Sequence, residues 1–130
     1  MRAIILHISL LGILLSCQKQ DPIIGNWRIE RDLINEETVD FLECSKKTVN
    51  SFTKDSLFIF ENYVMDETGN CQSLGKVTGF WRKKNDSVYL LSKGKYIDTI
   101  RLRFLKNNTT MILKNKYEED IFQLQKITVN

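Results

Sequence analysis

The carboxylates and the histidine are the side chains with which this chain could perform catalysis. Adjacent acids occur at residues 36–37 and 118–120, and paired carboxylates can act as general acid and base. No second catalytic group has a spacing that points to the same site, and adjacent acids in polar loops usually form solvated surface. The only histidine is His7, so the rest of the chain lacks the residue needed for Ser-His-Asp or Cys-His catalysis and the commonest metal ligand. We therefore expect a protein that is not an enzyme, with no metal site and no cofactor.

The chemistry of Cys17 depends on the segment before it. Arg2 gives a basic start, and residues 3–15 form an apolar run of about 13 residues, shorter than the roughly 20 of a membrane-spanning helix. The run ends in Leu14-Leu15-Ser16-Cys17, which resembles the lipobox of bacterial lipoproteins. The resemblance implies that residues 1–16 are removed as a signal peptide. It also implies that Cys17 carries lipid, including palmitate, and that residues 17–23 comprise this cysteine and a tether. The alternative is an ordinary signal peptide followed by a chance cysteine.

The residue after Cys17 bears on location. Among bacterial lipoproteins, glutamine at this position (Gln18) resembles a signal for sorting to the outer membrane. We expect a protein held on the outer membrane by its lipid, facing the periplasm or the cell surface. Without Arg2, the chain keeps all but one of its 19 basic residues against 16 acidic ones. This balance gives no electrostatic reason to expect nucleic acid as a partner, and we expect a monomer.

The other two cysteines, Cys44 and Cys71, form an even pair in a chain expected to reach an oxidising compartment. Such a pair indicates a structural disulfide. The alternative is a redox or metal-binding pair, but two thiols this far apart without histidine make a poor zinc site.

The elements that must position these residues are short strands separated by turn residues. The first strand is predicted to place Trp27, Ile29 and Leu33 on one face and Arg28, Glu30 and Asp32 on the other. Strands are predicted over residues 26–33, 48–52, 57–65, 76–82, 87–91, 95–105, 109–114 and 121–127. Lys93-Gly94 is predicted to turn the chain between two of them.

Between the first two strands, Asn35 could cap a short helix over residues 36–42, or the segment could be an irregular loop. Eight sequential strands with one apolar face form either two stacked sheets or one closed sheet. Short hairpins favour closure, so the sequence predicts an all-β, eight-stranded antiparallel up-and-down barrel over residues 24–130.

Three motifs carry a family resemblance. They are Ile24-Gly25-Asn26-Trp27, Gly69-Asn70-Cys71 and Gly79-Phe80-Trp81. The first resembles the Gly-x-Trp signature of lipocalins, and their order resembles the lipocalin-like domains of small bacterial lipoproteins over roughly residues 23–127. The resemblance implies that Trp27 plugs the closed end of the barrel and that an arginine, Arg101 or Arg103, packs across it. It also implies binding of a small hydrophobic or amphipathic ligand. Gly25 and Gly79 each stand two residues before a tryptophan, where a missing side chain leaves room for bulk.

An eight-stranded barrel can hold one small ligand or can be filled by its own side chains. The residues predicted to line its interior, as ligand-binding wall or as packed core, are Trp27, Phe58, Phe60, Trp81, Leu90, Ile100, Leu102, Phe104, Met111 and Phe122. A second hypothesis is an interaction module that binds another envelope protein or a glycan. It rests on residues 57–65, which are apolar on both faces.

Overall fold

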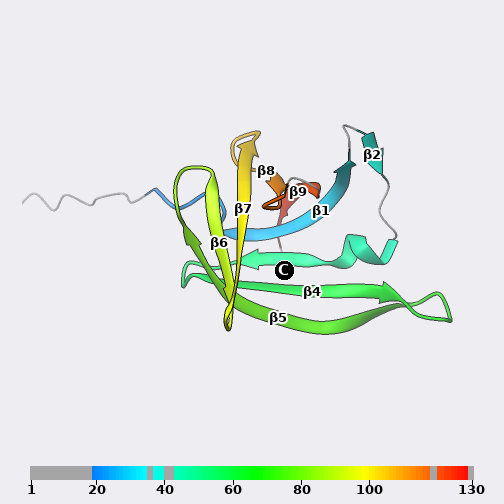
Figure 1. Ribbon diagram of the computed structural model, residues 1–130. Helices are drawn as coiled ribbons and strands as arrows, with labels where there is room; N and C mark the ends of the chain where they lie inside the picture. Colours follow the sequence, from blue (N-terminus) through cyan, green and yellow to red (C-terminus); the bar gives the residue numbers. More distant parts are fainter. Residues whose placement is uncertain (1–18, 35–36, 40–42, 118–119, 129–130) are drawn as a thin grey trace, which may run out of the picture.

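The strands of the computed structural model form one antiparallel sheet closed into a barrel (Figure 1). The structure describes residues 19–34, 37–39, 43–117 and 120–128. β1 pairs with β3 along one edge and with β9 along the other, which closes eight strands, and β2 adds a short ninth strand at the far end of β1. The strands are β1 (Gly25–Ile34), β2 (Glu37–Val39), β3 (Val49–Phe52), β4 (Leu57–Met65), β5 (Cys71–Lys83), β6 (Val88–Lys93), β7 (Tyr96–Leu105), β8 (Thr110–Lys114) and β9 (Ile121–Ile127). The predicted eight-stranded up-and-down barrel is confirmed.

The turns explain why neighbouring strands pair in sequence order. Gly94 lies between β6 and β7 with φ of 58°, a left-handed conformation that glycine adopts without steric cost. Between β7 and β8, Asn107 and Asn108 have φ of 55° and 63°, and asparagine tolerates this region better than most residues. The predicted turn at Lys93-Gly94 is therefore confirmed.

The segment after β1 differs from the predicted helix over residues 36–42. Residues 37–39 form β2, whose Val39 pairs with Asp32 and whose Glu37 pairs with Ile34. The β-branched Thr38 and Val39 favour a strand, and the end of β1 offers them a free edge. Residues 35–36 and 40–42 lie outside the described residues. A short 3-10 helix, η1 (Glu43–Lys47), follows instead.

The two ends of the barrel are defined by their connections. The closed end comprises residues 19–24 and the turns at 53–56, 84–87 and 106–109. The open end comprises η1, the turns at 66–70 and 94–95, and residues 115–117. In Figure 1 the β4–β5 hairpin extends furthest to the right, beyond the rest of the open end.

A dense core fills the closed end. Trp27, Tyr89, Met111 and Ile23 are fully buried. The indole Nε1 of Trp27 donates a hydrogen bond of 2.7 Å to the carbonyl oxygen of Ile23. Ile23, the last residue of the expected tether, is packed in this core.

Asp21 ties the entering chain to the opposite side of the closed end. The Tyr89 hydroxyl donates a hydrogen bond of 2.7 Å to Asp21 Oδ1, and Lys83 Nζ lies 3.6 Å from Asp21 Oδ2. Burial, followed by the hydrogen bond and charge of Asp21, raises the pKa of Tyr89. The hydroxyl therefore remains protonated and continues to act as donor.

Candidate functional site

The barrel contains a cavity of about 220 Å³ that begins beside the core and extends toward the open end. An engineered apolar cavity of about 150 Å³ in another protein holds benzene, so this space is large enough for a somewhat larger small molecule. Its walls combine apolar side chains with four polar residues. The lining residues are Ile29, Thr48, Asn50, Ser51, Phe52, Phe58, Ile59, Phe60, Asn62, Leu91, Leu113 and Leu124.

The aromatic part of this wall comes from β4 and depends on a glycine in β5. Phe58 and Phe60 stack with ring centroids 6.3 Å apart. Gly79 is the cross-strand partner of Phe58, and a Cβ atom built at Gly79 would overlap the Phe58 ring. The prediction that Gly79 leaves room for bulk is therefore confirmed.

A β-bulge in β1 changes which side chains face the barrel interior. Ile29 pairs with Leu124, but the register shifts before Arg31, and Asp32 then pairs with Phe122. Phe122 packs against the core from inside the barrel, and directly paired residues share a face. Asp32 therefore points inward, although strict alternation placed it outside and Leu33 inside. Redirecting a side chain is a common effect of a bulge.

Two buried polar atoms near the cavity have no hydrogen-bond partner among the described residues. They are Asp32 Oδ1 and Asn50 Nδ2. Asn50 pairs with Trp27 on one side and with Phe60 on the other, so it shares their inward face. A buried polar atom left unpaired costs about 1–3 kcal/mol. Asn50 is a residue of the cavity wall, whereas Asp32 is not.

The ten residues predicted to line the interior divide into three groups. Phe58 and Phe60 line the cavity. Buried in the core are Trp27, Trp81, Ile100, Leu102 and Met111, while Phe104 and Phe122 are partly buried against it.

Leu90 forms the third group, because it lies outside the core cluster. Its neighbours Tyr89 and Leu91 take the inward positions on β6, Tyr89 in the core and Leu91 at the cavity. The prediction for Leu90 is wrong by one residue, since two consecutive leucines carry no alternation signal.

The side chain that packs across Trp27 is a lysine. Lys126 pairs with Trp27 across β1 and β9, and its Nζ lies 5.0 Å from the centroid of the Trp27 ring. Arg101 and Arg103 are exposed, so neither has the position implied for an arginine. Burial lowers the pKa of Lys126, and the cation–π contact with the ring favours its charged form.

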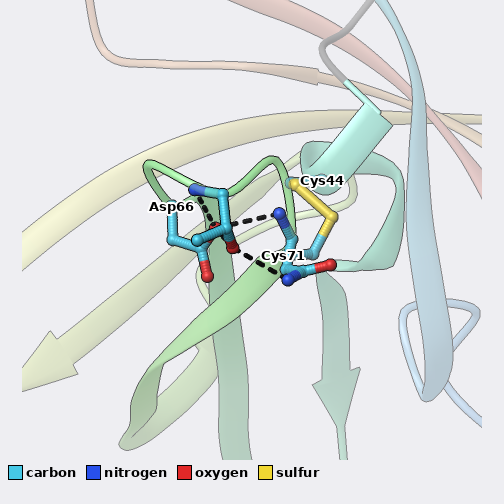
Figure 2. The surroundings of a disulfide bond; sticks show 5 residues. Cys44, Asp66 and Cys71 are labelled. Atoms are coloured by element: carbon cyan, nitrogen blue, oxygen red, sulfur yellow. Dashed lines mark hydrogen bonds between the residues drawn. A yellow bond between two sulfur atoms is a disulfide. The ribbon is translucent and has the colours of Figure 1, made fainter.

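A disulfide cross-links two elements at the rim of the open end (Figure 2). Cys44 in η1 is bonded to Cys71 at the start of β5, with Cα atoms 5.3 Å apart, which confirms the predicted pair. The adjoining turn is organised by Asp66, whose Oδ1 accepts hydrogen bonds of 2.9 Å from the backbone nitrogens of Thr68 and Asn70. These bonds, with that of the Thr68 hydroxyl, lower the pKa of Asp66.

Within the described part of the chain, no group of three or more histidine, cysteine or acidic residues is arranged to hold a metal ion. No helix in the same residues has the length and apolarity needed to cross a membrane. Cys17, predicted to be lipidated, and the predicted signal at residues 1–16 lie outside the described residues.

Comparison with known families agrees with the geometry. A family model described as a lipocalin-like domain matches residues 23–125. A search of curated proteins finds no match to the chain.

Proposed function

Because this chain belongs to the lipocalin-like domain family, we propose that its barrel binds one small apolar or amphipathic molecule without catalysis. The observation that carries the proposal is the 220 Å³ cavity beside Phe58 and Phe60. A cavity of this size holds a compact molecule or the tail of a longer one whose head extends through the open end. Apolar walls with a few polar groups are typical of small-molecule sites.

Dye binding tests the cavity directly. A variant in which a conventional cleavable signal peptide replaces residues 1–17 lacks both the apolar segment and the proposed lipid attachment point. It can therefore be studied without detergent that would compete for the cavity. We expect the neutral dye N-phenyl-1-naphthylamine to saturate at one molecule per chain. Signal that rises linearly with dye, without saturation, would contradict the proposal.

A pair of neighbouring substitutions provides the matched control. Leu91→Trp adds bulk to the cavity wall and is expected to weaken dye binding at least tenfold. Leu90→Trp makes the same change on the opposite face of β6 and should leave binding within about twofold. Circular dichroism checks that both variants keep the β-sheet spectrum. Equal effects of the two variants would place the dye elsewhere.

We further propose that Cys17 is lipidated and anchors the protein in the outer membrane. The residues before Cys17 support this, as does the entry of the chain at the closed end through Asp21 and Ile23. Residues 17–21 can span at most about 18 Å, so the closed end would lie near the membrane and the open end would face away. Intact mass and sucrose-gradient fractionation test the anchor. We expect acyl mass and outer-membrane location, both lost in Cys17→Ser. An unacylated protein in the soluble fraction would contradict it.

The β4–β5 hairpin favours a second function, that of an interaction module for an envelope protein or glycan. Val64, Met65 and Leu74 are 41%, 52% and 67% exposed. The alternative to a partner is cover by residues 35–44, of which 35–36 and 40–42 lie outside the described residues. Replacing the three exposed residues with serine in the acylated protein should abolish co-purification of a specific partner. A monomer that co-purifies nothing before the change would count against the module.

A further inference from the structure

The outer wall of the barrel carries a hollow of about 280 Å³ on β7 and β8. It extends to the closed-end turn at residues 84–87, which contributes one side chain to it. No residue of the interior cavity lines this hollow, so the two are separate features of the molecule. The residues that line it are Ser87, Arg101, Leu102, Arg103, Ile112 and Lys114.

All the charged side chains that line this hollow are cations. Arg101 and Lys114 are directly paired across β7 and β8. Arg103 lies two residues after Arg101 on the same face of β7. Like charges at directly opposed positions destabilise a sheet. The stability of the fold therefore gives no reason for this arrangement.

Within the described residues, no acid forms an ion pair with these three cations. The ion pairs found there join Lys83 to Asp21 and to Asp86. Asp86, although next to the hollow in sequence, therefore has Lys83 as its partner. A second surface hollow, around Arg31, differs because Glu30 is part of its lining. The three cations on β7 and β8 are thus available to an anion that comes from outside the chain.

The chemistry of the lining favours phosphate among common anions. The forked N–H groups of arginine match the oxygens of phosphate. A phosphate monoester carries about 1.5–2 negative charges at neutral pH, which suits a group of three cations better than the single charge of a carboxylate. Ile112 pairs with Arg103 and adds an apolar surface to the same hollow.

We propose that this hollow binds a phosphate monoester. The phosphate oxygens accept hydrogen bonds from Arg101, Arg103 and Lys114, and the carbon substituent of the ester lies against Ile112. Because a space of about 150 Å³ is enough to hold benzene, the hollow has room for the phosphate group and part of its substituent.

Two sources can present such a group: the head group of a membrane lipid and a soluble phosphate ester. The hollow extends to the closed end of the barrel, which the proposed lipid anchor would hold near the membrane. We therefore expect the lipid to be the source. This expectation rests on the proposed anchor, whereas the phosphate site itself does not.

Nuclear magnetic resonance titration with phenyl phosphate tests the site. The protein is the variant without residues 1–17 that is used for dye binding. We expect the backbone amide signals of residues 101–103 and 112–114 to shift and to saturate. Phenyl sulfate has the same ring but only one negative charge, and it should bind at least fivefold more weakly. Shifts that do not saturate, or equal affinity for the two compounds, would overturn the proposal.

Two double variants with the same change in charge identify the cations involved. Arg101→Gln combined with Arg103→Gln should weaken phenyl phosphate binding at least tenfold. Lys93→Gln combined with Lys95→Gln is the matched control, because both lysines are exposed at the other end of the β6–β7 hairpin. It should leave binding within about twofold. Arg103→Gln alone should weaken binding at least threefold if the double arginine variant does not fold. Equal losses in the arginine and lysine variants would overturn the assignment to this hollow.

Vesicle flotation distinguishes the two sources. Phosphatidylcholine vesicles contain an equal fraction of either phosphatidic acid, a phosphate monoester, or phosphatidylglycerol, a diester. We expect the protein to float mainly with the phosphatidic acid vesicles, and the double arginine variant to lose this binding. Saturable phenyl phosphate binding without flotation would support the site and overturn the lipid as its source. Because this protein carries no lipid, neither result depends on whether Cys17 is acylated. If neither phenyl phosphate nor the vesicles bind, the phosphate site fails, whatever the acylation test shows.

Discussion

The closed and open ends of this barrel are made by the same strands but treat their buried polar atoms differently. At the closed end the polar atoms of Trp27, Trp81 and Tyr89 are all paired, with Ile23, Thr53 and Asp21 respectively. Toward the open end, Asp32 Oδ1 has no partner among the described residues, and Asn50 Nδ2, on the strand beside Trp27, has none either. Paired groups stabilise a fold, whereas unpaired ones lower its stability. The pairing of its polar atoms therefore contributes to the stability of the closed end.

Removing the central side chain of the closed end should have the largest effect. Trp27→Ala deletes a fully buried indole and its hydrogen bond, and we expect the free energy of unfolding to fall by about 3–5 kcal/mol. Urea denaturation measures this. Phe80→Ala is the control, because Phe80 is 61% exposed and its loss should cost about 0.5 kcal/mol or less.

If Trp27→Ala does not fold, Trp27→Phe tests the same contact with a smaller change. In either folded variant the dye should still bind, since Trp27 does not line the cavity. Loss of dye binding in a variant that keeps its β-sheet would show that the cavity depends on the core of the closed end.

The disulfide should account for the next largest effect. Cys44→Ser combined with Cys71→Ser opens a link across 27 residues, and the chain-entropy model gives a loss of about 3–4 kcal/mol in the free energy of unfolding. Adding a reductant to the wild-type protein should produce the same loss. A wild-type protein that is insensitive to reductant and retains two free thiols would contradict the bond.

Much of this architecture could be predicted from the sequence because its signals are local. Turn residues such as Gly94 separate runs of apolar alternation, and cross-strand order follows from short connections. The disulfide required only the pairing of Cys44 and Cys71 in a chain expected to reach an oxidising compartment. These inferences need no knowledge of which strands become neighbours after closure.

The cavity could not be predicted because it depends on register. The bulge after Ile29 reverses the side to which Asp32 points. A strand without a bulge would turn the apolar Leu33 inward instead, and this pattern is equally plausible from the sequence. Closure also brings Lys126 beside Trp27, a contact between residues 99 positions apart that no local pattern indicates. The burial of Tyr89 was not predicted, because a buried hydroxyl needs a hydrogen-bond partner and no local pattern identifies Asp21 as that partner.

A smaller change tests whether pairing, rather than burial alone, distinguishes the closed end. Tyr89→Phe removes the hydroxyl that donates to Asp21 Oδ1 at 2.7 Å while keeping the ring. A hydrogen bond to a charged group contributes about 1.5–3 kcal/mol, and we expect a loss of that size in urea denaturation. The Tyr96→Phe change at an exposed position should be neutral. Equal changes in the free energy of unfolding for Tyr89→Phe and Tyr96→Phe would show that the hydrogen bond to Asp21 does not stabilise the closed end.

The opposite effect on the free energy of unfolding is expected at Asn50 in the cavity wall. Asn50→Leu replaces an unpaired buried amide with an apolar group, and we expect it to raise the free energy of unfolding by about 1 kcal/mol. Asn62→Leu, at an exposed residue of the same wall, should change stability by about 0.5 kcal/mol or less. Destabilisation by Asn50→Leu would show that the amide has a structural partner.

The smallest expected effect concerns acid stability at the rim of the open end. Hydrogen bonds from Thr68 and Asn70 lower the pKa of Asp66 below its usual 3.8, so the unfolded chain binds a proton more readily than the folded chain. Asp66 therefore contributes stability above about pH 4, and this is lost as the pH falls through the lowered pKa. Urea midpoints between pH 2 and 6 should fall less steeply in Asp66→Asn than in the wild type, whereas the adjacent Glu67→Gln should follow the wild-type curve. Because Asp66 is exposed, the difference should shrink in high salt. Parallel curves for wild type and Asp66→Asn would show that this turn does not contribute to the acid response of the fold.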